Sequence, residues 1–180
     1  MKQQSDSYYL DYDIYKMSQH FAEKVVDTNI DEYSKRNQSD IEKIKKDILI
    51  GKLAEWGVYF IYLERNRTKI DPPDMKVYNA WNKSFEPDLK WGLYNLHIKS
   101  QIAESSERYG DSWVFQAKDP LFGFSNEYDI VIGCRVSIER DGVYVGILLE
   151  KPFKELKFGE PKLSKFGGNK KVVYLKDNDE

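Results

Sequence analysis

The sequence predicts a single α/β domain, and three observations support this fold class. Two stretches carry apolar residues at helical spacing, two later stretches alternate as paired strands do, and the composition is that of a globular protein. The chain has 180 residues, of which 41% are hydrophobic and 32% charged, a length that fits one domain with its own core. We expect a helical extension over 1–38, a core over 39–150, and a C-terminal loop, strand and tail over 151–180.

The first 65 residues are predicted to be helical. An apolar stripe at helical spacing predicts an amphipathic helix over about 13–27; its members are Ile14, Met17, Phe21 and Val25. A polar connection over 28–38 follows. Ser39 and Glu42 match a capping box, which predicts a second helix that runs to about Glu64 or Arg65. Glu55 falls on the apolar stripe of this helix, so a carboxylate is expected on an inward face.

The rest of the chain is predicted to be mainly β-structure. After a loop over 66–73 we expect a strand over 75–81, a hairpin over 86–101 that turns near Trp91-Gly92, and a helical turn over 104–109. A strand over 113–116 precedes a strong hairpin over 128–138 and 143–149, joined through Asp141-Gly142. Residues 151–168 resemble a loop, 172–175 a last strand, and the acidic tail is expected to fray. In the first hairpin, Asn95, His97, Lys99 and Gln101 share one face, opposite Tyr94, Leu96 and Ile98.

Composition and missing motifs exclude several classes of protein. The single cysteine, Cys134, lies in an apolar run and is predicted to be buried. Two histidines and one cysteine cannot form a structural zinc site by themselves. The chain has no G-x-S-x-G elbow, P-loop or G-x-G-x-x-G, which argues against serine hydrolases, nucleotide-driven enzymes and dinucleotide enzymes. The N-terminus lacks a signal-peptide pattern and no apolar run could span a bilayer, so we expect a cytoplasmic protein with no membrane association.

Three features in chain order carry chemistry. They are Glu55 in a buried helix, Asp88 after Pro87 at the start of a strand, and His97-Ile98-Lys99 on the next strand. Phosphodiester cleavage needs a held cation, an activated water and neutralisation of charge at the phosphate. A carboxylate at a strand start can bind the cation, and a lysine can orient or help deprotonate the water. The net charge of −2 means that any nucleic-acid surface must be a local patch.

This order of residues resembles the PD-(D/E)XK nuclease superfamily, over roughly residues 39–149. The resemblance implies a restriction-endonuclease-like core, a central mixed sheet flanked by helices, and a DNA endonuclease that uses Mg²⁺, or Mn²⁺ in its place. It implies that Asp88 holds the metal and that Lys99 positions or activates the attacking water. Glu55 would be the helix carboxylate of the site, and Gln101 would contact the substrate phosphate or brace a ligand.

The sequence departs from the family pattern at the acidic position of the second half-motif, which is His97 here. Imidazole binds transition metals, whereas Mg²⁺ prefers oxygen. We therefore treat His97 as a candidate metal ligand and Glu55 or Glu86 as the replacement carboxylate. A rival assignment, Pro73-Asp74 with Asp88-Leu89-Lys90, ranks second because Pro87 would then lie in the strand that carries the second half-motif.

Each of these residues also has a purely structural interpretation. Glu55 could form an internal ion pair, and His97 could be a hydrogen-bonded strand histidine. Arg108, Trp113 and Gln116 are candidates for DNA contact, with Trp113 as a core residue in the alternative interpretation. A non-catalytic module on the same fold, which binds nucleic acid or a protein, is the second functional hypothesis, and an interaction protein with an aromatic surface is the third. The oligomeric state stays open, with a homodimer among the options.

Overall fold

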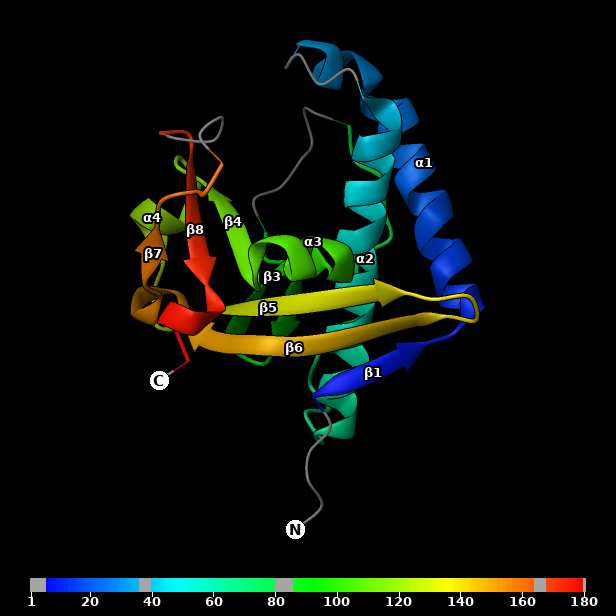
Figure 1. The fold of residues 1–180 in the computed structure, drawn as a ribbon. Helices are drawn as coiled ribbons and strands as arrows, with labels where there is room; N and C mark the ends of the chain where they lie inside the picture. The colour runs from blue at the N-terminus through cyan, green and yellow to red at the C-terminus, as the bar shows by residue number, and fades with distance from the viewer. Residues whose placement is uncertain (1–5, 36–39, 80–85, 164–167, 180) are drawn as a thin grey trace.

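The computed structural model describes residues 6–35, 40–79, 86–163 and 168–179 and shows an α/β fold built on a five-stranded mixed sheet (Figure 1). The strand order is β1-β6-β5-β3-β2, in which β3 and β5 run parallel and every other neighbouring pair is antiparallel. The strands are β1 (Ser7–Leu10), β2 (Leu89–Trp91), β3 (Tyr94–Ile102), β5 (Asp129–Ile138) and β6 (Val143–Pro152).

Two long helices, α1 (Tyr12–Lys35) and α2 (Ile41–Glu64), form an antiparallel pair beside this sheet (Figure 1). Helix α2 packs against β1, β3, β5 and β6, and Leu53, Val58 and Ile61 on it are fully buried. Gly57 lets the helix approach β6 closely, because a Cβ there would lie 2.4 Å from the Cβ of Val145. From Ile48 onward the sequence of α2 is apolar nearly all round, which indicates a helix packed on several sides, and the structure shows this packing.

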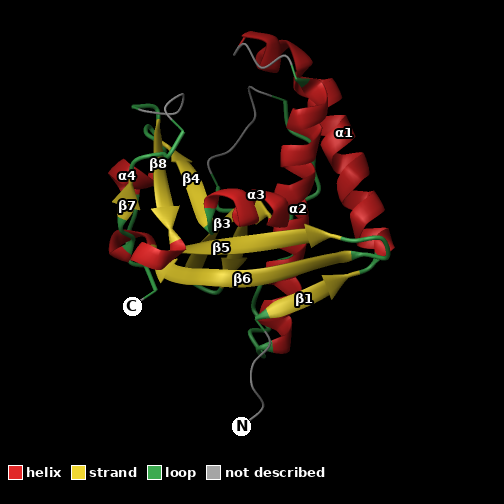
Figure 2. Ribbon diagram, viewed as in Figure 1, coloured by secondary structure: helices red, strands yellow, loops and turns green. Residues whose placement is uncertain are grey.

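A second, three-stranded sheet stands beside the first, with the order β4-β8-β7 (Figure 2). Its strands are β4 (Ser112–Gln116), β7 (Phe158–Gly159) and β8 (Lys170–Tyr174). The helix α3 (Ala103–Tyr109) links β3 to β4, α4 (Leu121–Phe124) follows β4, and short 3₁₀ turns cover Phe153–Glu155 and Leu175–Asp177. Val131 of β5 and Leu149 of β6 belong to the same apolar cluster as Trp113 and Phe115, so this cluster joins the two sheets.

Both predicted hairpins, the turn over 104–109 and the strands near 113–116 and 172–175 are confirmed. Gly92 takes a left-handed φ of 58° in the first hairpin, which explains the turn there. Cys134 is fully buried, as expected. No helix in the described residues combines the length and the hydropathy that a bilayer span requires.

Two local predictions were wrong at the N-terminal side, and one strand was missed. Helix α1 continues through the expected connection to Lys35, with a kink at Asn29, whose side chain bonds to Val25 and Tyr78 carbonyls. Helix α2 is capped by Asp40, whose side chain accepts from the Lys43 amide, while Ser39 lies outside the described residues. Strand β1 was not predicted at all.

Three further predictions were wrong in the loops and the tail. The segment expected to be a loop from residue 151 onward contains the end of β6, a 3₁₀ turn and β7, which pairs with β8. Residues 75–79 form no strand, and the Asp74 carboxylate accepts hydrogen bonds from the Lys76 amide and the Tyr78 hydroxyl; 80 and 81 lie outside the described residues. The tail is anchored rather than frayed. Asn178 is 1% exposed, and its side chain bonds to the Lys157 backbone and to the Tyr174 carbonyl.

Candidate active site

Asp88 lies immediately before β2 and is fixed to the neighbouring strand. Its Oδ2 accepts a hydrogen bond of 2.7 Å from the Ile98 amide, where the β2–β3 ladder ends. Asp88 keeps contact with solvent, yet the protein atoms crowded around its carboxylate raise its pKa above the usual range. The Ile98 amide and the charges of Lys99, His97 and Lys52 oppose this rise. Three basic side chains therefore lie within electrostatic range of Asp88.

Glu55 joins this neighbourhood from helix α2. Its side chain is 14% exposed, and Lys52 Nζ lies 2.5 Å from Glu55 Oε2. Burial raises the pKa of Glu55 to about 8, the charges of Asp88 and Asp74 add to the rise, and Lys52 opposes it. Glu55 and Asp88 thus belong to one cluster of carboxylates. The internal ion pair of the alternative interpretation is also present, because Lys52 is held by Glu55, by the Asp74 carbonyl at 2.9 Å and by the Phe21 ring at 4.6 Å.

Lys99 extends from β3 on the face predicted from the sequence. Leu96 and Ile98 pack in the cluster that contains α2, whereas Lys99 Nζ lies 4.7 Å from the centroid of Phe115 in the other cluster. The ammonium is 3.8 Å from Asp119 Oδ2, and its side chain is 29% exposed. Burial and the charge of Lys99 lower the pKa of Lys170. Lys99 is therefore a partly accessible cation with a second lysine in range.

His97 is braced by a carboxylate of the adjacent parallel strand. His97 Nε2 lies 2.9 Å from Asp129 Oδ1, and Asp129 also accepts from Asn95 and from the Asn126 amide. Burial alone would raise the pKa of Asp129, but the hydrogen bonds from His97, Asn126 and Asn95 hold it below its usual range. His97 is thus a hydrogen-bonded strand histidine, as its alternative interpretation held. Sequence analysis missed Asp129, although it opens the strongest strand of the chain.

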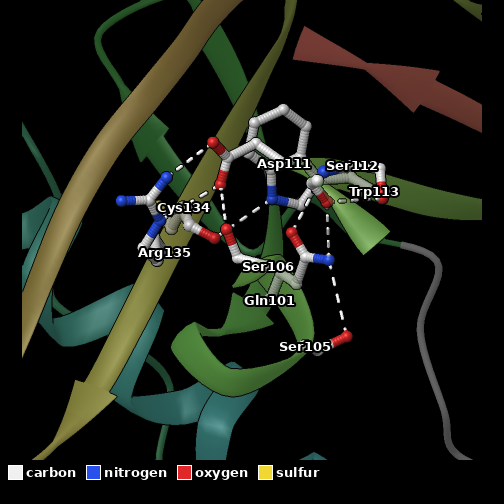
Figure 3. A network of polar contacts seen from close by, with 9 residues as sticks. Gln101, Ser105, Ser106, Asp111, Ser112, Trp113, Cys134 and Arg135 are labelled. Carbon is white, nitrogen blue, oxygen red and sulfur yellow. Dashed lines mark hydrogen bonds and ion pairs between the residues drawn. The ribbon is translucent and has the colours of Figure 1, made fainter. Parts of the chain in front are cut away.

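Gln101 braces the segment that follows α3 (Figure 3). Its Nε2 donates to the Gly110 carbonyl at 3.1 Å and to Ser105, and its Oε1 accepts from the Ser112 amide at 3.0 Å. Alongside it, the Asp111 carboxylate accepts from Ser106 and from the Arg135 guanidinium. The Gln101 amide therefore positions the start of β4, and contact with a phosphate would require it to exchange these bonds.

The three residues proposed for DNA contact differ in their exposure to solvent. Trp113 is 1% exposed, and its Nε1 donates to the Cys134 carbonyl at 3.0 Å, so the prediction that it meets DNA is wrong and its core interpretation is right (Figure 3). Alternation along β4 points Trp113 inward against Gly133, where a Cβ would lie 2.6 Å from the ring. Arg108 on α3 and Gln116 at the end of β4 are exposed and stay candidates.

The rival assignment gains less support from the geometry. Asp74 is occupied by the Lys76 amide and the Tyr78 hydroxyl, although its charge reaches Glu55. Lys90 is exposed on β2 opposite Asn95. Glu86 is exposed as well.

Within the described residues, no group of three or more His, Cys, Asp or Glu side chains is arranged to hold a metal ion. Of the three predicted ligands, Asp88 and Glu55 lie within electrostatic range of each other. His97, the third predicted ligand, is engaged with Asp129 instead.

A pocket of about 460 Å³ opens next to Lys99. Its walls come from the N-terminal half of α2, the second half of β3, α3, β4, β8 and residues 161–163. Lys99 and Gln101 both line it, so two of the site residues predicted from the sequence share one pocket.

The chain was compared with known proteins by sequence and by structure. No protein-family model, curated protein or solved structure matches it.

Proposed function

We propose that the protein is a divalent-metal-dependent endonuclease with a restriction-endonuclease-like core, which hydrolyses DNA phosphodiester bonds with an activated water. The observation that supports this best is that Asp88 lies within electrostatic range both of Glu55 on α2 and of Lys99 on β3. Two neighbouring carboxylates, one of them within range of a partly accessible lysine, match what the chemistry needs: oxygen ligands for a cation and a positive group for the phosphate.

The carboxylates fit a divalent cation by their charge. Desolvation raises the pKa of both Asp88 and Glu55, so the protein alone disfavours their charged forms, and a bound cation would stabilise those forms. Mg²⁺ keeps several waters and needs only one or two protein carboxylates. Asp88 and Glu55 would hold the ion, which when bound supplies charge neutralisation and a more acidic water.

The protein's own residues would orient the reactants. The hydrogen bond from the Ile98 amide fixes the direction of the Asp88 carboxylate. Lys99, held loosely over Phe115 and 3.8 Å from Asp119, retains donors for a phosphate oxygen or for the attacking water. Lys170 lies within electrostatic range of Lys99, because burial and the charge of Lys99 lower the pKa of Lys170.

Cleavage of supercoiled plasmid and of single-stranded circular DNA, each with Mg²⁺ or Mn²⁺, tests the proposal. Asp88→Asn and Lys99→Met should each lower the rate by about 100-fold or more, the scale at which single electrostatic groups act in active sites. Lys90→Met is the matched control, because Lys90 is an exposed lysine of the same hairpin. Loss of activity in Lys90→Met with retention in Lys99→Met would establish the rival assignment, and robust cleavage by Asp88→Asn would refute both.

A non-catalytic DNA-binding module on the same fold is the second candidate. It is favoured by the Lys52–Glu55 and His97–Asp129 pairs, which occupy two of the three predicted ligands. Calorimetric titration with Mn²⁺ distinguishes the two proposals. Absence of metal binding with DNA affinity retained at low salt supports the module, whereas one bound ion that is lost in Asp88→Asn supports the enzyme.

A further inference from the structure

We propose that the 460 Å³ pocket beside Lys99 receives one unstacked nucleotide, so that the strand recognised is single-stranded DNA. This inference rests on the proposed function for its choice of DNA and deepens it by naming the substrate class. The volume of the pocket falls in the range of about 300–1,000 Å³ that is typical of small-ligand sites.

The charge of the pocket suits an anion. Two lysines line it, Lys99 on β3 and Lys162 before β8, and Asp47 is the acidic residue among its described lining. Asp47 is already paired, because Lys43 Nζ lies 2.7 Å from its carboxylate. Lys99 lies 3.8 Å from Asp119. The Lys162 ammonium, in contrast, donates to the neutral Tyr109 carbonyl at 2.8 Å, so Lys162 keeps a positive charge for a phosphodiester.

The walls also offer surfaces for a base. Apolar side chains from both sheets, among them Ile102, Val114 and Val172, lie beside the hydroxyls of Ser105 and Tyr109. Tyr174 lines the pocket with its ring fixed, since its hydroxyl donates to the Glu160 carbonyl and accepts from the Lys162 amide. Fixed aromatic and apolar faces next to polar groups are the usual means of holding an unstacked base.

Access to Lys99 favours a flexible strand over a duplex. The Lys99 side chain is only 29% exposed and lines the pocket, so a phosphate must enter the pocket to reach it. A duplex keeps its bases stacked inside and presents a stiff backbone, whereas a single strand can turn one nucleotide into a recess. The same position of Lys99 that supports the proposed chemistry thus argues for single-stranded DNA.

Fluorescence anisotropy with EDTA present measures this binding without cleavage. The probes are a fluorescein-labelled mixed-sequence DNA strand of about 15 nucleotides, the same strand annealed to its complement, and the RNA strand of the same sequence, all at about 50 mM salt. We expect the DNA strand to bind about tenfold or more tightly than the duplex, the size expected when one base gains its stacking contacts. Tighter binding of the RNA strand than of the DNA strand would assign the pocket to RNA and overturn the proposal as stated.

Variants separate the pocket from nonspecific attraction. Val114 is 46% exposed, so Val114→Trp should fill the pocket without disturbing the core and weaken strand binding about tenfold, while Val114→Thr should leave it unchanged. Lys162→Glu should weaken binding as well, with Lys154→Glu as its matched control on an exposed position outside the pocket.

The outcomes of this experiment and of the plasmid assay are independent. Equal or tighter duplex binding, or strand binding unaffected by both Val114→Trp and Lys162→Glu, would overturn the pocket assignment even if the protein cleaves plasmid. Selective strand binding by a protein that cleaves no DNA would leave the pocket assignment standing and remove the proposed activity.

Discussion

Glu55→Gln should make the stability of the protein less dependent on pH. Burial raises the pKa of Glu55 from 4.5 to about 8, so the folded protein keeps a proton that the unfolded chain has lost between these values. Stability from this group is therefore complete below pH 4.5 and is lost as the pH rises through 8. The slope is about 1.4 kcal/mol per pH unit, which gives at most about 5 kcal/mol over the whole window. This is a large share of the stability of an ordinary domain.

Urea denaturation between pH 5 and 8.5 measures the effect. Glutamine is neutral in both states, so the free energy of unfolding of the wild type should fall relative to that of Glu55→Gln as the pH rises. Glu64→Gln, at the exposed end of the same helix, is the control and should run parallel to the wild type. If Glu55→Gln also runs parallel to the wild type, Glu55 titrates normally and the buried-carboxylate reasoning is refuted.

Three further predictions concern the packing around the candidate site. Gly133→Ala would place a Cβ 2.6 Å from the Trp113 ring and should lower the free energy of unfolding, by about 1–3 kcal/mol in urea titration. Asp111→Asn should cost about 1 kcal/mol at neutral pH, because the Arg135 guanidinium outweighs burial and holds the Asp111 pKa below its usual range; the difference should vanish in acid, where the carboxylate is protonated. Cys134 is fully buried and burial raises its pKa, so it should react with a thiol reagent only in denaturant; rapid labelling of the native protein would contradict this.

Local signals in the sequence identified most elements but could not determine how they pair. The β2–β3 and β5–β6 hairpins join strands that are neighbours in the chain, and their turn residues predict both hairpins. Strand β1 pairs with β6 more than 130 residues away, and its four residues are too few to show a period. The pairing of β4 with β8 also joins segments that are far apart in the chain, so the two strands were predicted while their common sheet was not.

The candidate site shows the same division between local and distant information. Helical periodicity placed Glu55 inward, and strand alternation placed His97 and Lys99 on one face, because both depend only on neighbouring residues. Lys52 stands three residues before Glu55, a spacing that brings side chains together on a helix, so this partner was within reach of sequence reasoning. Asp129 was not, because only the parallel register of β3 and β5 brings it to His97.

Protonation of Glu55 links the two candidate functions to one measurement. A carboxyl with a pKa near 8 is largely neutral at pH 7, and a neutral carboxyl is a poor ligand for a cation. If Asp88 and Glu55 bind a metal together, binding must expel this proton, so Mn²⁺ affinity should rise as the pH approaches 8 and titrations in buffers of different ionisation enthalpy should reveal proton release. A module that only binds DNA has no reason to release it. Metal binding without proton release, or with unchanged release in Glu55→Gln, would separate Glu55 from the metal and leave it as the partner of Lys52 alone.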